Sequence, residues 1–441
     1  MKYISGPYTS GQLKQKIDSI ETSLTNRFMR LKETGSTGAI SDAAERRYWS
    51  EKIEDASFGR NTVIFDDLQY PSVMVTIPLV KQIDVLAGSL SYPHPAFIVN
   101  DNTKATFNMS KYQNIVAGTG ASARALSLKG VDPTVNINYD NSLLYCKQKG
   151  SGWHLATNAE WAALALLCKS RGFMPRGNNN YGSDHAVTHE KGIPSYAYSG
   201  TTIGRVLTGS GPVTWSSDGS PFGVYDLCGN VLEWTGGLRI NAGEIQIITN
   251  NNAADNTVDQ TATSAAWRAM LQNGTLCHTK WVTGTSYALN AVIAPANGKT
   301  YKCTTAGTSG STEPTWPDAD TVTDGTAVWT YQADLTLKYD GTATPVISTA
   351  VTTGAAVNTT FDTLAAAAGV TVPNLAKLLA LAPIDASHGG DRFYVDSRGE
   401  KIPFRGGDWS YTSSAGVFAL DLYRVRTFSH GYIGFRSAFV S

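Results

Sequence analysis

The residue types that could support catalysis or metal binding are scattered along this chain. Five cysteines lie between Cys146 and Cys303, and none belongs to a CxxC pair. This odd and unpaired set argues against both a disulfide framework and a zinc site. His185 and His189 form an HxxxH pattern, but their flanking sequences NNNYGSD and KGIP are typical of loops rather than of a helix that would hold a metal. We therefore predict buried free thiols and no catalytic constellation.

The carboxyl-terminal stretch RGGDWSYTSSAGVFALDLYRVRTFSHGYIGFRSAFVS (405–441) alternates two kinds of residue. Glycine, tryptophan and aliphatic residues suited to fixed packing are separated by an assortment of aspartate, serine, tyrosine, arginine, phenylalanine and histidine. In VFALDLY (417–423), a strand would place the large apolar residues on one face and Asp421 and Tyr423 on the other. We expect the first face to belong to the core and the second to vary freely. The mixed set resembles a binding surface, because tyrosine and arginine often dominate interfaces.

Length and charge restrict the class of protein. With 441 residues, of which 42% are apolar, the chain can bury a large core and form about two or three domains. Its formal net charge is zero, which argues against nucleic acid or an anionic membrane surface as partners. There is no apolar run long enough to span a membrane and no signal-peptide core at the start. We expect assembly in a cytoplasm, without membrane insertion.

The first elements predicted to position the carboxyl-terminal residues are helical. Residues 10–32 place apolar side chains at heptad-like spacing, which fits either a short coiled coil or an amphipathic helix lying on its own domain. A coiled coil would make the chain an oligomer, with a trimer favoured. The apolar positions are Leu13, Ile17, Ile20, Leu24 and Leu31.

The rest of the chain predicts an α+β fold with few helices. The sequence TVIFDDLQYPSVMVTIP, which follows Asn61, has the β-branched texture of strands. TNAEWAALALLCKSRG (157–172) predicts a helix capped by Thr157 or Asn158, and NLAKLLALAP predicts a second helix that ends at Pro383. Many short segments punctuated by glycine and asparagine separate these elements.

Residues 281–333 differ from their surroundings. They are rich in threonine and glycine and carry spaced aromatic residues, including Trp281, Trp316 and Trp329. We interpret them as a small all-β module inserted in a loop of the larger domain. Its tryptophans could form the core that a tiny domain needs, or a platform for sugar rings. The segment loosely resembles carbohydrate-binding modules of chitinases and phage tail proteins.

Three motifs together carry a family resemblance. They are GWHLATNAEWAALA (152–165), GVYDLCGNVLEWTGG (223–237) and the closing frame FRGGDW … IGFRSAF. In this order they resemble the formylglycine-generating-enzyme (sulfatase-modifying factor) branch of the C-type lectin fold. The resemblance covers most of residues 90–441 apart from the stretch 281–333.

This resemblance implies an enzymatic alternative and a metal site. Enzymes of the family bind copper through two cysteines near the carboxyl terminus, but this chain has no cysteine after Cys303, so we expect no enzyme and no required cofactor. Family members also hold calcium at the turn that matches YDLCGNVLEW, and oxygen ligands suit that ion. A hydrogen-bonded turn, with Glu233 paired to an arginine, is the alternative. The implied calcium ligands are Asp226, Gly229, Val231 and Glu233.

The closing stretch further resembles the variable proteins diversified by retroelements, many of which are phage receptor-binding proteins. Their template RGGNWNNG.NAGVFALNLNN … NNNIGFR mutates at asparagine codons, so the resemblance implies a constant frame and a changeable ligand-binding surface. The implied variable residues and their neighbours are Asp408, Ser410, Tyr411, Ser413, Ser414, Asp421, Tyr423, Arg424, Arg426, Phe428, His430, Gly431 and Tyr432.

The function expected from the sequence is receptor recognition at a phage tail tip or fibre. Residues 1–60 would attach or oligomerise the chain, and 61–441 would form the lectin-type domain with its variable region at 404–441. Partners would be a bacterial surface receptor, either protein or glycan, and other tail proteins of the virion. The alternatives are a formylglycine-generating oxidoreductase and a structural tail or baseplate protein without a variable site.

Overall fold

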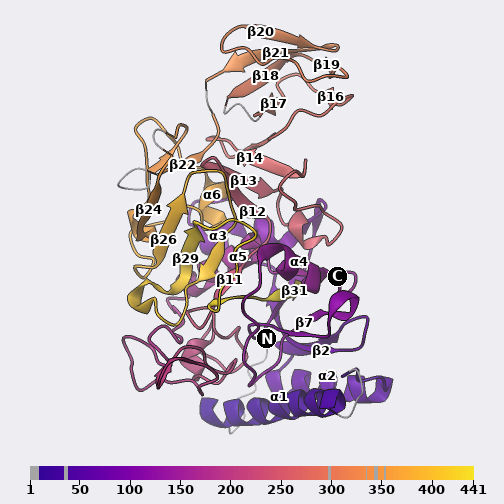
Figure 1. Cartoon of the computed structure of the whole chain (residues 1–441), viewed down its shortest axis with the longest axis vertical. Helices are drawn as coiled ribbons and strands as arrows, with labels where there is room; N and C mark the ends of the chain where they lie inside the picture. The colour runs from indigo at the N-terminus through magenta and orange to yellow at the C-terminus, as the bar shows by residue number, and fades with distance from the viewer. Residues whose placement is uncertain (1–8, 34–37, 296–298, 334, 342–345, 352–353) are drawn as a thin grey trace.

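The computed structural model describes residues 9–33, 38–295, 299–333, 335–341, 346–351 and 354–441. The molecule is elongated, with the two amino-terminal helices at one end and the strands of residues 286–332 at the other (Figure 1). Mixed helices and strands confirm the α+β expectation. The helices are α1 (Ser10–Glu33), α2 (Ala43–Ser57), α3 (Gln82–Val85), α4 (Tyr139–Lys147), α5 (Asn158–Ser170) and α6 (Asn374–Leu378).

Helix α1 packs on its own chain. Its apolar face joins a cluster that includes Tyr112 and Trp215 of the larger domain. The Nζ atom of Lys111 lies 2.7 Å from Glu21 of α1, and both side chains are fully buried. Because this face is already covered, the structure favours the amphipathic-helix alternative over a coiled coil on this seam. The heptad-like spacing marks an amphipathic helix that lies on its domain.

Helix α5 is the central helix of the domain. Thr157 accepts a hydrogen bond from the Glu160 amide and Glu160 accepts one from Thr157, so the predicted cap is a full capping box. Residues 158–168 are all buried. The indole nitrogen of Trp161 donates to the Val417 carbonyl at 2.8 Å, which ties the helix to a strand of the carboxyl-terminal region. The other predicted helix, α6, is shorter than expected.

The carboxyl terminus is built into two sheets. One five-stranded sheet contains the last strand, β31, between β5 and β8, and the predicted strands β1 and β2 extend it. A six-stranded sheet has the order β24-β26-β29-β28-β11-β30 and lies beside α5 (Figure 1). The strands are β1 (Asn61–Phe65), β2 (Pro71–Pro78), β5 (Thr106–Ser110), β31 (Ser437–Phe439), β8 (Trp153–Leu155), β24 (Ala356–Thr360), β26 (Arg392–Asp396), β29 (Gly416–Leu422), β28 (Phe404–Gly406), β11 (Leu232–Trp234) and β30 (Ile433–Phe435).

A third sheet extends away from the helices. It continues through a single parallel pair between β15 and β17 into the strands of residues 281–333. Its strands are β12 (Leu238–Asn241), β13 (Glu244–Ile248), β14 (Trp267–Met270), β15 (Leu276–His278), β17 (Val292–Ile293), β18 (Thr300–Thr305), β20 (Thr321–Asp324), β21 (Ala327–Gln332), β22 (Lys338–Asp340), β23 (Val346–Ser348), β25 (Ala365–Ala366) and β27 (Glu400–Lys401). Two-stranded ribbons are β3 (Ile98–Val99) with β4 (Asn102–Thr103), β6 (Ile115–Ala117) with β7 (Arg124–Leu126), β9 (Ala197–Ser199) with β10 (Thr202–Ile203), and β16 (Ser286–Tyr287) with β19 (Gly307–Thr308).

The aromatic residues of 281–333 pack on one another. Trp329 is fully buried in a cluster separate from the other apolar clusters, and Trp281 and Trp316 pack against it. The indole nitrogens of Trp281 and Trp329 both reach Asp324, at 2.8 and 3.3 Å. These contacts favour the core interpretation of the tryptophans over the sugar platform.

Strand β29 departs from the sequence expectation on one face. As predicted, Phe418, Leu420 and Leu422 join the main core. The opposite face is not open to solvent, however, because every residue of β29 is buried and Asp421 is only 7% exposed. The reason is tertiary: β29 lies inside the sheet, and the loop that follows it folds back over its second face.

Candidate functional site

A pocket of about 240 Å³ lies on the second face of the six-stranded sheet. Tyr394, Asp421 and Phe404 are register partners across β26, β29 and β28, so their side chains form one row on that face. The segments before and after β29 supply the walls. The lining residues are Leu232, Arg392, Tyr394, Phe404, Asp408, Ser410, Tyr411, Asp421, Arg424, Phe428 and Tyr432.

The structure gathers many of the sequence-predicted residues in this pocket. Asp408, Ser410, Tyr411, Asp421, Arg424, Phe428 and Tyr432 all line it. Four lining residues were not predicted from the sequence, among them Arg392 and Tyr394 of β26. No spacing in the sequence could have found them, because β26 becomes the parallel neighbour of β29 only in the folded chain.

Asp408 and Asp421 place two carboxylates in the pocket. The sequence predicted that both side chains would be exposed, but both are buried. Asp421 accepts a hydrogen bond from the Tyr423 amide at 3.0 Å, and burial raises the pKa of its carboxyl group to about 6. Asp408 is 3% exposed and accepts from the amide and hydroxyl of Ser410 at 2.8 and 2.7 Å. Burial also raises the pKa of Asp408. An ionised carboxylate in such surroundings favours a ligand that donates hydrogen bonds.

Aromatic rings and arginines form the walls. The Arg392 guanidinium lies over Tyr394 and Tyr411, 4.5 and 4.7 Å from the ring centroids. Tyr423 stacks on Tyr394 with centroids 4.2 Å apart, so it supports the wall although it does not line the pocket. These planar contacts hold the guanidinium and the rings in fixed orientations.

The far wall repeats this pattern. Arg424 lies over Tyr423 and Phe428, at 4.7 and 4.2 Å from their centroids. The exposed ring of His430 packs on Tyr432 at 3.9 Å, just outside the lining. This wall consists of side chains that contact one another, and Phe428 and Tyr432 also pack against the apolar cluster that contains Trp234.

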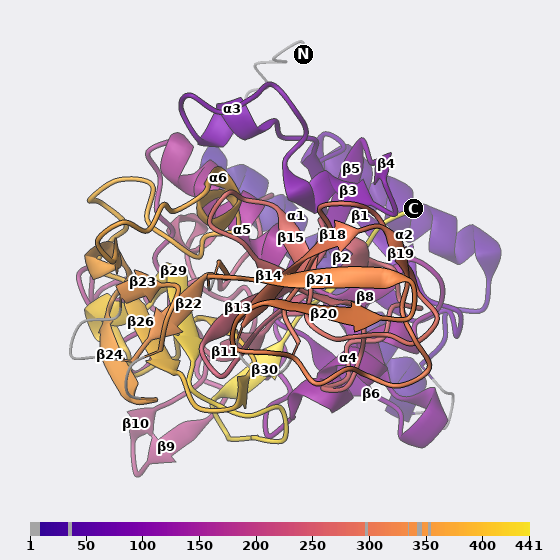
Figure 2. The same cartoon turned by 90° about the horizontal axis from the view of Figure 1, so that it is seen from above.

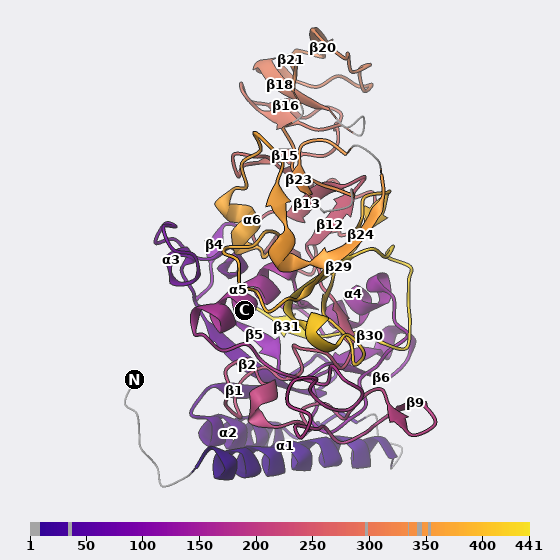
Figure 3. The same ribbon diagram turned by 90° about the vertical axis from the view of Figure 1, so that its left-hand side faces the viewer.

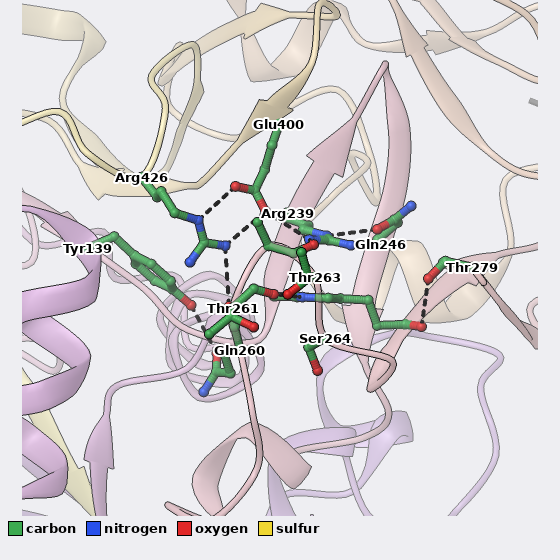
Figure 4. Close-up of polar contacts among 12 residues, drawn as sticks. Tyr139, Arg239, Gln246, Gln260, Thr261, Thr263, Ser264, Thr279, Glu400 and Arg426 are labelled. Atoms are coloured by element: carbon green, nitrogen blue, oxygen red, sulfur yellow. Dashed lines mark hydrogen bonds and ion pairs between the residues drawn. The ribbon is translucent and has the colours of Figure 1, made fainter. Parts of the chain in front are cut away.

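Arg426 does not belong to the candidate binding surface, contrary to the prediction. Its guanidinium binds both oxygens of Glu400 at 2.8 Å (Figure 4). It also binds Asp140 at 2.8 Å. Glu400 also binds Arg239 at 2.8 Å. Arg426 is thus a structural link between the carboxyl-terminal loop, helix α4 and the third sheet.

The remaining predicted residues lie outside the pocket lining. Ser413 and Ser414 belong to a short 3₁₀ turn, Thr412–Ser414, that follows the pocket segment. The Gly431 carbonyl accepts a hydrogen bond from Arg205 at 2.9 Å, so this position contributes its backbone rather than a variable side chain.

The frame residues of the carboxyl-terminal motif are fixed independently of the pocket. Arg405 is fully buried and donates to Asn158 at 3.0 and 2.6 Å. Arg436, also fully buried, binds Glu233 at 2.5 and 2.6 Å. Gly407 has φ +79°, and a Cβ atom there would lie 2.8 Å from Ala415, so only glycine fits. The motif therefore encodes the support of the pocket.

The four residues implied as calcium ligands surround an amide nitrogen. Nε2 of Gln113 lies 3.1 Å from the Asp226 carbonyl, 3.4 Å from that of Gly229, 3.1 Å from that of Val231 and 3.0 Å from Oε1 of Glu233. The other amide atom, Oε1, accepts from Asn230 at 2.8 Å, which orients the nitrogen toward those oxygens.

The carboxylates of this turn are also not arranged around a common centre. Glu233 is neutralised by Arg436, as the hydrogen-bonded alternative predicted. The Asp226 carboxylate turns to the Gly209 amide at 2.9 Å, and burial raises its pKa to about 6. Its Oδ1 atom has no hydrogen-bond partner among the described residues. As arranged, these residues do not fit a calcium ion, because the Gln113 amide takes the central position.

We predict that a large excess of chelator leaves the melting temperature unchanged. Replacing Gln113 by alanine should instead lower the free energy of unfolding by about 1–3 kcal/mol, because buried carbonyl oxygens lose their donor. Differential scanning calorimetry with and without EDTA measures both effects. A chelator-induced drop in the parent protein would show that a cation is bound near Asp226.

The cysteines are buried, as predicted, in the described part of the chain. Burial raises the pKa of the Cys168 thiol to about 12, and it raises the pKa values of Cys146 and Cys228 as well. Such thiols remain protonated and unreactive at neutral pH.

A match to a family model supports the family resemblance of part of the chain. Residues 97–314 match the family model of the sulfatase-modifying factor enzyme 1-like domain. Among solved structures, the chain is similar to PvdO from Pseudomonas aeruginosa at 20% identity, with a TM-score of 0.23, over 40% of this chain and 74% of that chain. Comparison with curated proteins gives no match. The family match contains α4, α5, Gln113 and β11 with its lining residue Leu232, and it ends before β26, β28 and β29, which carry other lining residues. No helix among the described residues is long and apolar enough to cross a membrane.

Proposed function

We propose that this chain is a recognition protein whose carboxyl-terminal pocket binds a receptor on a bacterial surface. One observation carries the proposal: seven of the residues singled out in the sequence as changeable line one pocket of about 240 Å³. The motif residues that flank them, Arg405 and Arg436, are buried in the supporting framework. A constant scaffold with replaceable walls is what a protein needs when its specificity must change without unfolding.

The composition of the pocket supports binding rather than catalysis. Tyrosine and phenylalanine rings offer large contact areas at little cost in side-chain entropy, and arginines between them add directed donors. The oxidoreductase alternative would need reactive cysteines near the carboxyl terminus. The sequence has none after Cys303, and the described cysteines are buried.

The finer parts of the proposal rest on the sequence resemblance. They are a C-type lectin architecture with a variable region at 404–441, an inserted β module at 281–333, diversification by a retroelement, and a place at the tail tip or fibre of a phage. A homo-oligomer would offer several sites at once and so gain avidity. Since the apolar face of α1 is buried within the chain, such an oligomer would have to use another surface.

The proposal is tested by exchanging the outer wall of the pocket. We define the rim residues as Tyr423, Arg424, Phe428 and Tyr432, and the rim variant as the chain in which all four are asparagine. Binding of fluorescently labelled protein to a panel of bacterial cells should fall at least about a hundredfold in the rim variant, since several aromatic and arginine contacts are lost together. Tyr48, an exposed tyrosine on α2, provides the control, because Tyr48→Ala should bind normally. Unchanged binding by the rim variant would refute the proposed site.

A further inference from the structure

An exposed aromatic hairpin lies beside the pocket. The ribbon of β9 and β10 projects on the same side of the molecule as the yellow carboxyl-terminal loop (Figures 2 and 3). Its tyrosines Tyr196 and Tyr198 are 39% and 58% exposed, and the neighbouring Tyr181 is 41% exposed. Large apolar rings exposed together often mark an interaction surface. The sequence analysis did not single out this hairpin.

The hairpin and the pocket are joined by ring contacts through the buried Trp409. Tyr196 packs on Trp409 with ring centroids 6.2 Å apart, and Trp409 packs on Tyr432 of the pocket wall at 6.2 Å. On the other side of the hairpin, Tyr198 lies 6.4 Å from Tyr181. Trp409 itself is only 4% exposed, so a ligand seated in the pocket would contact Tyr432 and Tyr196 on either side of this buried ring.

The base of the hairpin is fixed to the pocket segment. Arg205 donates to the Gly431 carbonyl at 2.9 Å, binds Asp132 at 2.7 Å and lies 4.2 Å from the centroid of Tyr196. The backbone amide of Tyr181 donates to the Trp409 carbonyl at 2.9 Å. These links hold the exposed rings at a set position relative to the pocket, which reduces the entropy cost of binding a long ligand.

The donor and acceptor types of this surface define the ligand. Asp408 and Asp421, when ionised, only accept hydrogen bonds, whereas Arg392 and Arg424 only donate them. A hydroxyl group does both, so a polyol can bridge the two sets, while an ammonium or a carboxylate suits only one. The hairpin sequence IPSYAYSGTTI (193–203) contains no charged residue. Its tyrosine rings present flat faces on which sugar C–H groups can pack.

We infer that the receptor is a glycan of uncharged sugars, with one sugar unit in the pocket and the following units on Tyr196 and Tyr198. This inference rests on the proposed function, since it names the ligand of the same pocket. In this arrangement the pocket recognises the hydroxyl groups of one sugar. The hairpin contacts the following sugars, so its contribution depends on the length of the glycan. A protein receptor is the competing outcome.

The test uses the full chain and the bacterial cells to which it binds. Cells are treated either with sodium periodate, which cleaves sugars at neighbouring hydroxyls, or with proteinase K. The inference predicts that periodate removes binding and that proteinase K does not. Tyr198→Ala should weaken binding about tenfold or more. Tyr92→Ala, which changes a tyrosine that is 62% exposed near α3, should have no effect.

Each contrary result has a distinct meaning. Binding that survives periodate but not proteinase K would overturn the glycan and leave the proposed site intact, provided that the rim variant no longer binds. Normal binding by Tyr198→Ala would remove the hairpin from the site. If the rim variant binds as well as the parent, or if no cells in the panel are bound, both the glycan and the proposed function fail.

Discussion

Replacing Asp421 by asparagine should raise the free energy of unfolding at pH 7 and abolish receptor binding. Asp421 is 7% exposed, and burial raises the pKa of its carboxyl group from 3.8 to about 6, so the ionised form is held at a cost. A pKa shift of this size corresponds to a destabilisation of the folded state by at most about 3 kcal/mol at pH 7. Asparagine removes the charge and keeps an oxygen for the Tyr423 amide, but it removes an ionised acceptor from the inner end of the pocket.

The difference in unfolding free energy between the parent and Asp421→Asn should depend on pH. A carboxyl group whose pKa is raised on folding holds its proton in the folded chain after the unfolded chain has lost it. Its contribution therefore falls as pH rises from about 4 to about 6, and the ionised group destabilises the fold above that window. Urea unfolding across pH 4–7.5 should show the parent losing stability relative to Asp421→Asn over this range. A variant that is less stable than the parent at pH 7 would show that the carboxylate supports the fold.

Replacing Arg426 by alanine should destabilise the chain strongly. The side chain of Arg426 is 13% exposed and that of its partner Glu400 is 18% exposed, so the pair is largely shielded from water. Removing the guanidinium would leave the Glu400 carboxylate paired with Arg239 alone. Asp140 would lose its ion pair with Arg426. We expect a loss of about 2–4 kcal/mol, toward the lower part of the range for broken buried ion pairs.

Arg424 provides a matched control two positions earlier in the same loop. It lies over two aromatic rings, and its loss should cost at most about 1 kcal/mol. The effects on binding should be the reverse of the effects on stability. Arg424→Ala should reduce receptor binding per folded molecule, whereas Arg426→Ala should largely retain it. Denaturant titration and cell binding measured on both variants separate the two roles. Equal stability losses would mean that Arg424 also belongs to the framework.

The sequence was sufficient for features that depend on local pattern. The helix cap at Thr157 and the strand that contains Leu420 follow from residue spacing, and the structure has both. The spacing in α1 predicted an amphipathic helix but left open whether its apolar face packs on its own domain or on another chain. Seven residues singled out in the closing segment also gather around one pocket, because the loops at both ends of β29 return to the same face of the sheet. A pattern within one segment can be read without knowledge of the rest of the chain.

Features that depend on distant segments could not be predicted. Asp421 is buried in a sheet in which its neighbour is Tyr394, which comes from a distant strand. Arg426 has a structural role because it binds Glu400, which lies outside its own loop. Gln113 lies far before the turn whose carbonyl oxygens accept its hydrogen bonds. Nothing around Gln113 in the sequence indicates that its side-chain amide occupies the position expected for an ion. The hairpin tyrosines gain significance only because Trp409 lies beside them.

The melting temperature of the rim variant tests the central claim most directly. Pocket walls that can be exchanged without loss of the fold require that replacing Tyr423, Arg424, Phe428 and Tyr432 together lowers the melting temperature by only a few degrees and leaves the transition cooperative. An unfolded rim variant, or one with a melting temperature as low as that of Arg426→Ala, would show that these side chains hold the domain together and would contradict the account.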